Sequence, residues 1–264
     1  MNLQLEGRAA IITGGSLGIG RAIAEAFARE GMSVAIVARS VGPLEQAAAE
    51  ITAATGARVL AVPADVSNTA AVDAAVARAA AAFGRLDVLV NGAAPPGGLV
   101  RNEIEQADPD KLLEDIDIKV VGYFRMARAV VPHMKANRFG RILNIGGLTG
   151  RGSKQISGMR NVAICHMTKS LSDQLGPFGI TANVIHPGVV DTPHIRELYA
   201  NEAKKQGLTV EQVEANYVAN TPIRRTLQPG EIADTALFLC SPLAGAITGE
   251  SIGVDGGITR GIFL

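Results

Sequence analysis

The chain has 264 residues, of which 47% are hydrophobic and only 4% aromatic. This length suits one large α/β domain with a core built mainly of Ala, Val, Ile and Leu. Lys and Arg together number 25, as do Asp and Glu. With no net charge to attract nucleic acid or an anionic membrane surface, small-molecule partners are favoured over both.

The two cysteines, Cys165 and Cys240, are far apart in the sequence and lack the spacing of metal ligands. We expect reduced thiols and a cytoplasmic protein, because a chain of this size folds without a disulfide. Residues Met1 to Glu6 show no basic stretch followed by an apolar one, and no segment approaches the ~20 apolar residues that span a bilayer. Export and membrane insertion are not expected.

Short β-rich runs alternate with longer Ala-rich amphipathic runs, which is the pattern of a parallel sheet with helices on both faces. We predict an α/β fold of the Rossmann type, with one doubly wound, seven-stranded parallel sheet and no domain boundary within residues 1–264. The predicted strands are Ala9–Thr13, Ser33–Ala38, Arg58–Pro63, Leu86–Asn91, Arg141–Ile145, Thr181–Ile185 and Ser251–Val254. The predicted helices are Arg21–Glu30, one with Pro43 in its first turn, Thr69–Phe83, Pro109–Asn137, Ser157–Leu175 and Glu231–Cys240.

A polar segment with a helical pattern, Asp191 to Arg225, follows the sixth predicted strand. Loops at this edge of a parallel sheet commonly carry ligand contacts. We interpret residues 191–225 as an inserted lid over the substrate.

The segment Thr13–Gly20 reads Thr-Gly-Gly-Ser-Leu-Gly-Ile-Gly and links the first predicted strand to the first predicted helix. Gly14 can adopt backbone angles closed to other residues, while Gly18 and Gly20 let a pyrophosphate and the strand approach the helix start. The spacing is GxxxGxG, and its place between a strand and a helix predicts a dinucleotide site.

The second predicted strand ends about twenty residues later, where NAD-binding proteins tend to carry a carboxylate for the ribose hydroxyls. Here the strand is followed by Arg39 and Ser40. Arg39 could hold the 2′-phosphate of NADP through charge-assisted hydrogen bonds, with Ser40 assisting, which favours NADP over NAD. The alternative is a solvated arginine at a strand end.

Nearly the whole chain resembles the short-chain dehydrogenase/reductase family. Besides the glycine turn, Asp65-Val66 resembles the family's adenine contact, and Leu86–Ala94 resembles its Asn-Asn-Ala-Gly strand end with Gly92 in place of the second asparagine. Pro187–Thr192 resembles the segment that grips the nicotinamide, and residues 248–257 resemble the last strand. Together with Arg39 and Ser40, the resemblance implies cofactor contacts from Gly14, Ser16, Leu17, Gly18, Ile19, Gly20, Asp65, Val66, Asn91, Gly92, Ala93, Pro187, Gly188, Val190 and Thr192.

The resemblance also implies a homodimer or homotetramer, in which the helices Pro109–Asn137 and Ser157–Leu175 pack across subunits. Assembly with an active relative into a hetero-oligomer is the alternative.

The family's catalytic set is asparagine, serine, tyrosine and lysine; the tyrosine protonates a carbonyl oxygen as hydride arrives, and the lysine lowers the tyrosine pKa. Aligned on Thr168–Leu171, these four positions hold Lys119, Gly147, Ser157 and Asn161. The chain has three tyrosines, and none is followed four residues later by lysine. Because a serine hydroxyl is a weak acid, ordinary ketone reduction should be impaired. An imine, which needs no such proton donor, or an activated alkene fits better.

Lys119 is a candidate proton donor, because the resemblance places it on a helix lining the pocket, where desolvation would lower its pKa. Lys154, in a loop above the sheet, is a candidate substrate contact, and His186 and His194 are candidate acids or bases. The alternatives are a lysine in a structural ion pair, an exposed loop lysine and structural imidazoles. The four histidines are scattered and predict no metal site.

Two functional classes remain open. The first is an NADPH-dependent oxidoreductase with a non-standard active site, acting on a small organic substrate such as an imine, an activated alkene or an unusual carbonyl compound. The second is a catalytically silent subunit that keeps the fold in order to assemble with an active relative, since fold does not entail function.

Overall fold

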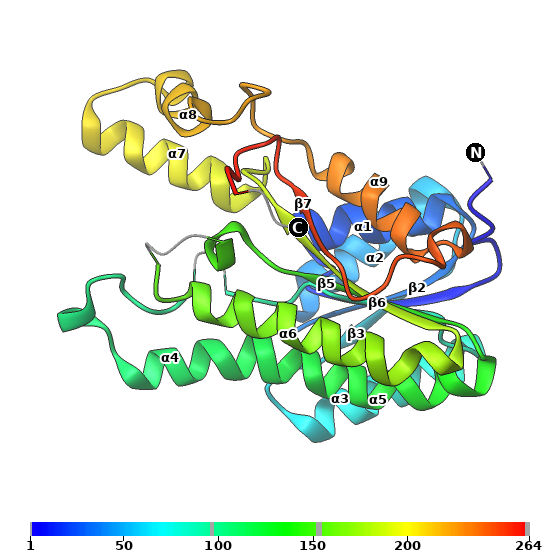
Figure 1. Ribbon diagram of the computed structural model, residues 1–264. Helices are drawn as coiled ribbons and strands as arrows, with labels where there is room; N and C mark the ends of the chain where they lie inside the picture. Colours follow the sequence, from blue (N-terminus) through cyan, green and yellow to red (C-terminus); the bar gives the residue numbers. More distant parts are fainter. Residues whose placement is uncertain (1, 96–97, 152–154, 262–264) are drawn as a thin grey trace.

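The computed structural model describes residues 2–95, 98–151 and 155–261. Seven parallel strands form one sheet in the order β3-β2-β1-β4-β5-β6-β7 (Figure 1). This confirms the fold predicted from the alternating pattern. The strands are β1 (Ala9–Thr13), β2 (Ser33–Ala38), β3 (Val59–Pro63), β4 (Val88–Asn91), β5 (Gly140–Ile145), β6 (Ile180–Pro187) and β7 (Ser251–Val254).

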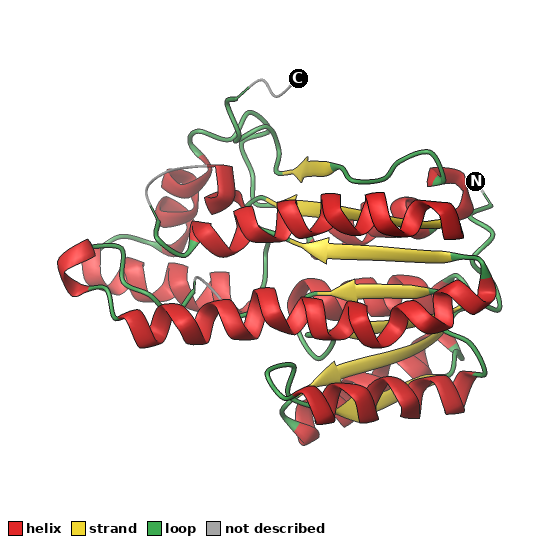
Figure 2. Cartoon of the chain, turned by 60° about the horizontal axis from the view of Figure 1, so that its bottom comes forward, coloured by secondary structure: helices red, strands yellow, loops and turns green. Residues whose placement is uncertain are grey.

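Helices cover both faces of the sheet (Figure 2). One layer, with α1 and α9 in contact, packs on one face, and a second layer, with α3 and α5 in contact, packs on the other. The α-helices are α1 (Gly18–Arg29), α2 (Val41–Thr55), α3 (Thr69–Phe83), α4 (Pro109–Ile116), α5 (Gly122–Asn137), α6 (Gly158–Leu175), α7 (Pro193–Gln206), α8 (Val210–Val218) and α9 (Pro229–Cys240).

The interior strand β1 shows why both faces must be covered. Its residues alternate between two apolar clusters: Ala10 and Ile12 pack with α1, α2 and α9, whereas Ala9 and Ile11 pack with α3 and α5. All four are at most 1% exposed. A continuous apolar strand of this kind is stable only between two helical layers.

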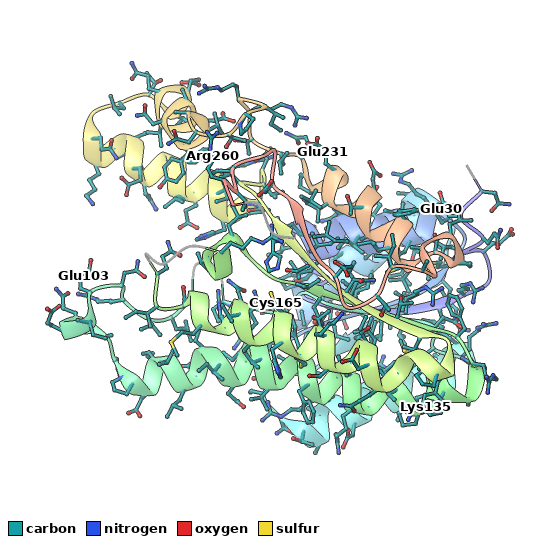
Figure 3. The ribbon with its side chains drawn as sticks, in the orientation of Figure 1. Glu30, Glu103, Lys135, Cys165, Glu231 and Arg260 are labelled. Carbon is teal, nitrogen blue, oxygen red and sulfur yellow. The ribbon has the colours of Figure 1, made fainter. Side chains whose placement is uncertain are left out.

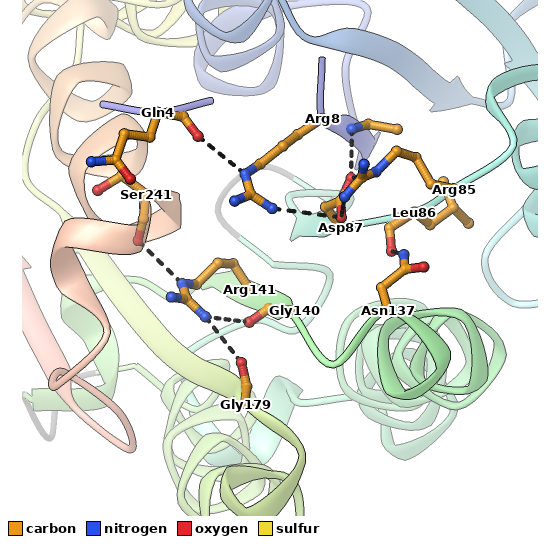
Figure 4. Close-up of polar contacts among 11 residues, drawn as sticks. Gln4, Arg8, Arg85, Leu86, Asp87, Asn137, Gly140, Arg141, Gly179 and Ser241 are labelled. Carbon is orange, nitrogen blue, oxygen red and sulfur yellow. Dashed lines mark hydrogen bonds and ion pairs between the residues drawn. The ribbon is translucent and has the colours of Figure 1, made fainter. Parts of the chain in front are cut away.

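A polar network closes the amino-terminal end of the sheet (Figure 4). The buried Asp87 carboxylate accepts hydrogen bonds from Arg85 and from the backbone N–H of Ala9, at 2.7 and 2.9 Å. Beside it, buried Arg141 donates to the backbone carbonyl oxygens of Gly140, Gly179 and Ser241. The Asp87 contacts tie the starts of β1 and β4 together, and the Arg141 contacts tie the start of β5 to the residues that precede β6 and follow α9.

The segment predicted as one helix over Pro109–Asn137 is divided in the structure. A π-helical turn, Asp117–Val121, separates α4 from α5. The wider turn rotates the residues that follow it relative to a continuous α-helix, and such turns are frequent at functional sites. It carries Lys119, which is buried.

The first helix also differs from its predicted bounds, since α1 begins at Gly18 rather than at Arg21. Its first turn contains two glycines and no apolar stripe, so the hydrophobic pattern could not reveal it. Within the predicted lid, residues 191–225, the structure places α7 and α8, which pack through Tyr199, Ala203 and Val213. That they act as a lid stays a prediction.

Candidate active site

A cavity of about 390 Å³ lies at the carboxyl ends of β1, β2 and β4, where the strand order changes direction. Ligands of doubly wound sheets bind at this switch point. Its lining is Gly14, Leu17–Gly20, Val37–Arg39, Ala64–Val66, Gly92–Pro95, Ile118, Ile145 and Thr192–His194.

The glycine turn makes this cavity possible. Gly14 has φ +71°, and a Cβ added to it would lie 2.8 Å from the carbonyl oxygen of Gly92. A Cβ on Gly20 would lie 2.3 Å from the carbonyl oxygen of Gly14. Only glycine allows this close approach of turn, helix and neighbouring loop.

The start of α1 is suited to an anion. No side chain caps this helix, so the N–H groups of its first turn remain available beside the cavity, at the positive end of the helix dipole. The residues present therefore fit the pyrophosphate of a dinucleotide. Arg39, at the end of β2, lines the same cavity.

The residues predicted to contact the cofactor fall into two groups. Gly14, Leu17, Gly18, Ile19, Gly20, Arg39, Asp65, Val66, Gly92, Ala93 and Thr192 line the cavity. Ser16, Ser40, Asn91, Pro187, Gly188 and Val190 are not part of this lining. Of these, Asn91 is fully buried and donates to Asn144 Oδ1 at 2.9 Å, and Val190 packs in the core. The cofactor contacts of both groups stay predictions.

A second cavity, of about 250 Å³, adjoins the first and shares Gly92, Ala94, Pro95 and Ile145 with it. We call it the inner cavity. Its remaining lining is Lys119, Tyr123, Gly146, Gly147, Thr149, Gln155, Arg160 and Asn161. A substrate held there would lie directly beside a ligand of the larger cavity.

Lys119 is 3% exposed and lines the inner cavity. Its Nζ atom donates to the carbonyl oxygen of Gly146 at 2.8 Å and to Asn161 Oδ1 at 2.9 Å. Desolvation by burial, with repulsion from Arg160, lowers the pKa of Lys119 to about 7. Near neutral pH this amine can both donate and accept a proton.

Asn161 holds Lys119 in place. Its Nδ2 atom donates to Thr149 Oγ1 at 2.7 Å, which leaves Oδ1 directed at the lysine. A Cβ added to Gly147 would lie 2.9 Å from Asn161 Nδ2. The glycine at 147 therefore gives the amide its room.

Two hydroxyl groups near this cavity are poor acids. Tyr123 donates its hydroxyl proton to the carbonyl oxygen of Ile145 at 3.1 Å, and burial raises its pKa well above the usual range. Ser157, at the start of α6, is buried and is not among the lining residues of the inner cavity. Lys119, by contrast, lines the inner cavity and has a pKa near neutrality.

His186 does not reach either cavity lining. Its Nδ1 atom lies 3.0 Å from both the N and the O atoms of Gly147, and its Nε2 atom lies 2.8 Å from Ser251 Oγ. Burial lowers its pKa, so it favours the neutral form. His186 therefore holds the backbone of Gly147 through its Nδ1 atom. An acid or base role for His186 stays a prediction.

The sequence predicts a reduced thiol at Cys165 and gives no indication of the residues that it contacts. On α6 (Figure 3), Cys165 Sγ lies 3.4 Å from His186 Nε2 and 3.5 Å from Ser251 Oγ. His186 is 21 positions and Ser251 is 86 positions from Cys165 in the sequence. No local spacing could have revealed these contacts.

Arg160 and Asp115 were also missed. Arg160 lines the inner cavity and pairs with Asp115, which is fully buried behind it. A signal was present, because Arg160 precedes Asn161 on a helix already predicted to border the site. Lys154, predicted as a substrate contact, lies outside the described residues.

No group of three or more His, Cys, Asp or Glu residues in the described part of the chain is arranged to hold a metal ion. Over the same residues, no helix combines the length and apolar character needed to cross a bilayer. His194 lines the larger cavity, at the start of α7.

Comparisons with known proteins agree with this geometry. The family described as enoyl-(acyl carrier protein) reductase matches residues 14–259. The chain is 37% identical over 254 residues to the short-chain reductase protein NovJ of Streptomyces niveus, covering 94% of this chain and 92% of that protein. It is 35% identical to the (2S)-[(R)-hydroxy(phenyl)methyl]succinyl-CoA dehydrogenase subunit BbsD of Thauera aromatica, covering 97% and 98%.

Among solved structures, L-sorbose reductase from Gluconobacter frateurii, complexed with NADPH and L-sorbose, superposes with a TM-score of 0.93 at 33% identity, covering 99% of this chain and 100% of that chain. These likenesses extend over the glycine turn, both cavities and the last strand. The chain belongs to the short-chain dehydrogenase/reductase family.

Proposed function

We propose that this protein is an NADPH-dependent reductase of a small organic substrate in which Lys119, rather than a tyrosine, supplies the proton. The observation that carries the proposal is the position of Lys119. It is a buried amine with a pKa of about 7, and it lines the inner cavity, which adjoins the larger cavity at the glycine turn. The NADPH bound by the related L-sorbose reductase supports the choice of cofactor.

When bound, NADPH would supply hydride from its nicotinamide ring to the substrate carbon. The first turn of α1 would hold the pyrophosphate, and Arg39 the 2′-phosphate. Thr192, Pro193 and His194 close the same cavity from the start of α7. These residues bind and orient the cofactor, and the inner cavity receives the substrate.

The bonding of Lys119 explains how it would transfer a proton. A lysine ammonium has three N–H bonds. Two are used by Gly146 O and Asn161 Oδ1. Among the described residues there is no third acceptor, so the remaining N–H can be donated to a substrate oxygen, nitrogen or carbon as hydride arrives. Afterwards the neutral amine keeps both protein hydrogen bonds.

Hydride transfer in this site could reduce carbonyl, imine or activated alkene acceptors, which differ in their need for a proton from Lys119. An iminium carbon is neutralised by hydride alone and would not need Lys119, whereas a carbonyl or an enone would. The dependence of turnover on Lys119 therefore separates the acceptor classes.

The test is a turnover screen with NADPH across ketones, imines and enones, comparing wild type with Lys119→Met. General acid catalysis is worth about 10²- to 10⁴-fold, so kcat for the preferred carbonyl or enone substrate should fall by that range with NADPH affinity unchanged. Lys205→Met, at an exposed position of α7, is the control and should leave kcat unchanged. Full activity of Lys119→Met on a carbonyl substrate would refute the role of Lys119.

A second candidate is a subunit that is silent alone and assembles with an active relative. It is favoured by the tyrosines, because the Tyr123 hydroxyl donates to the carbonyl oxygen of Ile145, while Tyr199 on α7 and Tyr217 on α8 pack against each other with their rings tilted by 52°. The name of the related BbsD marks that protein as a subunit of a dehydrogenase. Tight NADPH binding with no turnover in the screen, and raised activity of a co-expressed relative, would favour this candidate.

A further inference from the structure

The inner cavity has an unusual charge arrangement. Two of its lining residues, Lys119 and Arg160, are basic, and none of its described lining residues is acidic. Its other polar side chains are those of Tyr123, Thr149, Gln155 and Asn161. The wall therefore offers hydrogen-bond donors and positive charge to whatever enters.

Arg160 is 7% exposed, so its charge needs compensation inside the protein. Asp115 supplies part of it by accepting a hydrogen bond from Nη1, and the carbonyl oxygen of Pro95 accepts one from Nη2 at 3.2 Å. A guanidinium has five N–H bonds. Its Nε atom and Asp115 Oδ2 are both buried without a partner among the described residues. Asp115 and Pro95 accept two of the N–H bonds of Arg160, and the guanidinium lines the cavity with further N–H bonds that no described residue accepts.

Asp115 lies behind Arg160 rather than on the cavity wall, because it is fully buried and absent from the lining. One negative charge thus faces two basic groups. A second anion, placed in the cavity, would complete an arrangement of two positive and two negative charges. A planar carboxylate can accept two parallel hydrogen bonds from the forked donors of arginine.

We propose that Arg160, held by Asp115, recognises a carboxylate group of the substrate in the inner cavity, beside Lys119. The substrate class is then an organic acid that also carries the reducible group. The inference rests on the proposed function for the place of the substrate, and it does not require turnover.

Carboxylate binding would also act on Lys119. Burial and repulsion from Arg160 lower the pKa of this amine. A bound anion nearby offsets both effects and favours the ammonium form. Substrate binding would thereby load the proton that the reaction consumes, and the protein should take up a proton from solution when a carboxylate binds at a pH above 7.

The probe is a matched pair, crotonate and crotonamide, which have the same shape and differ in charge. Their affinities for the protein, in the presence of NADP⁺, are measured by ligand-observed NMR at about pH 8. Because hydrogen bonds between charged groups are the stronger ones, crotonate should bind about tenfold more tightly than crotonamide. Calorimetry in phosphate and in Tris buffer should show proton uptake with crotonate and none with crotonamide.

Removing Arg160 alone would leave Asp115 buried and unpaired and could unfold the protein. The variant is therefore the double substitution Arg160→Met with Asp115→Leu, whose folding is checked by circular dichroism and thermal melting. It should lose the preference for crotonate. The matched control replaces an exposed arginine–aspartate pair, Arg128→Met with Asp73→Leu, and should keep it.

A third variant, Lys119→Met, should abolish proton uptake and retain part of the preference for crotonate. Equal affinity for acid and amide in the wild type, or an unchanged preference in the folded double variant, would overturn the proposal. Turnover of neutral ketones without any preference for acids would leave the reductase function standing and remove this inference. Selective crotonate binding without turnover of any substrate would support this inference and contradict the proposed reductase function.

Discussion

At the scale of single residues, Lys119 makes activity depend on pH. As a proton donor it must be charged, and with a pKa of about 7 its charged fraction falls about tenfold per pH unit above that value. We predict that kcat/KM for a carbonyl or enone substrate, which follows the ionisation of the enzyme before the substrate binds, declines as the pH rises from 7 to about 9. In Lys119→Arg, whose guanidinium stays charged, this decline should disappear even where the rate is lower. A decline that persists in Lys119→Arg would assign the titration to another group.

The same group has the opposite effect on stability. Between a pKa of about 7 in the folded protein and the ordinary lysine value of 10.5, the unfolded chain binds a proton that the folded chain does not. Stability therefore rises with pH through this window, as far as Lys119 contributes. Activity and stability are thus expected to favour different sides of neutral pH.

Arg39 decides between the two nicotinamide cofactors. It is exposed just after β2 and lines the larger cavity, where only NADPH would present a 2′-phosphate for it to bind. We predict that Arg39→Ala weakens the binding of NADPH by about ten- to a hundredfold and the binding of NADH much less, since charge-assisted hydrogen bonds to the 2′-phosphate are lost only with NADPH. Fluorescence titration with both cofactors measures this. Equal losses for NADPH and NADH would contradict the preference for NADP.

At the scale of elements, the polar network at the beginning of β1 and β4 should stabilise the sheet. Asp87→Ala removes the acceptor of the buried Ala9 N–H group and the partner of Arg85. We expect it to lower the free energy of unfolding by about 2–3 kcal/mol, measured by denaturant titration. Asp73→Ala breaks a pair whose side chains are each 49% exposed, and should cost less than about 1 kcal/mol. Similar losses in both variants would show that burial of Asp87 adds nothing.

The elements were also what the sequence predicted best. All seven strands were predicted from short runs of apolar residues. Helix α3 begins and ends as predicted, at Thr69 and Phe83, because Asn68 caps its start and Gly84 its end. The active site was less accessible to prediction. The resemblance singled out Lys119 and Asn161, but the hydrogen bond between them joins residues 42 positions apart. The ion pair of Arg160 with Asp115 spans 45 positions. Contacts of this range depend on how helices pack, which no local pattern records.

At the scale of the whole molecule, large apolar side chains are exposed on α4, α5 and α6. Leu113, Phe124, Met159 and Val162 are each more than half exposed. Exposed apolar side chains gathered on neighbouring helices commonly mark an interface between proteins. We propose that this surface holds two copies of the chain together, as the resemblance to the family implies.

Charged residues on this surface should therefore disrupt assembly. We predict that the double substitution Phe124→Arg with Val162→Arg shifts the protein to a species of half the mass or less in analytical ultracentrifugation, because paired surfaces would then bury like charges. Val210→Arg, at an exposed apolar position of α8, is the control and should leave the mass unchanged.

Assembly also bears on the inner cavity, because Lys119 lies on the π-helical turn that precedes α5 and Arg160 lies on α6. Loss of assembly could therefore loosen this cavity. NADPH affinity and crotonate selectivity are measured on the dissociated variant for this reason. A wild-type protein that sediments as a monomer would exclude the interface.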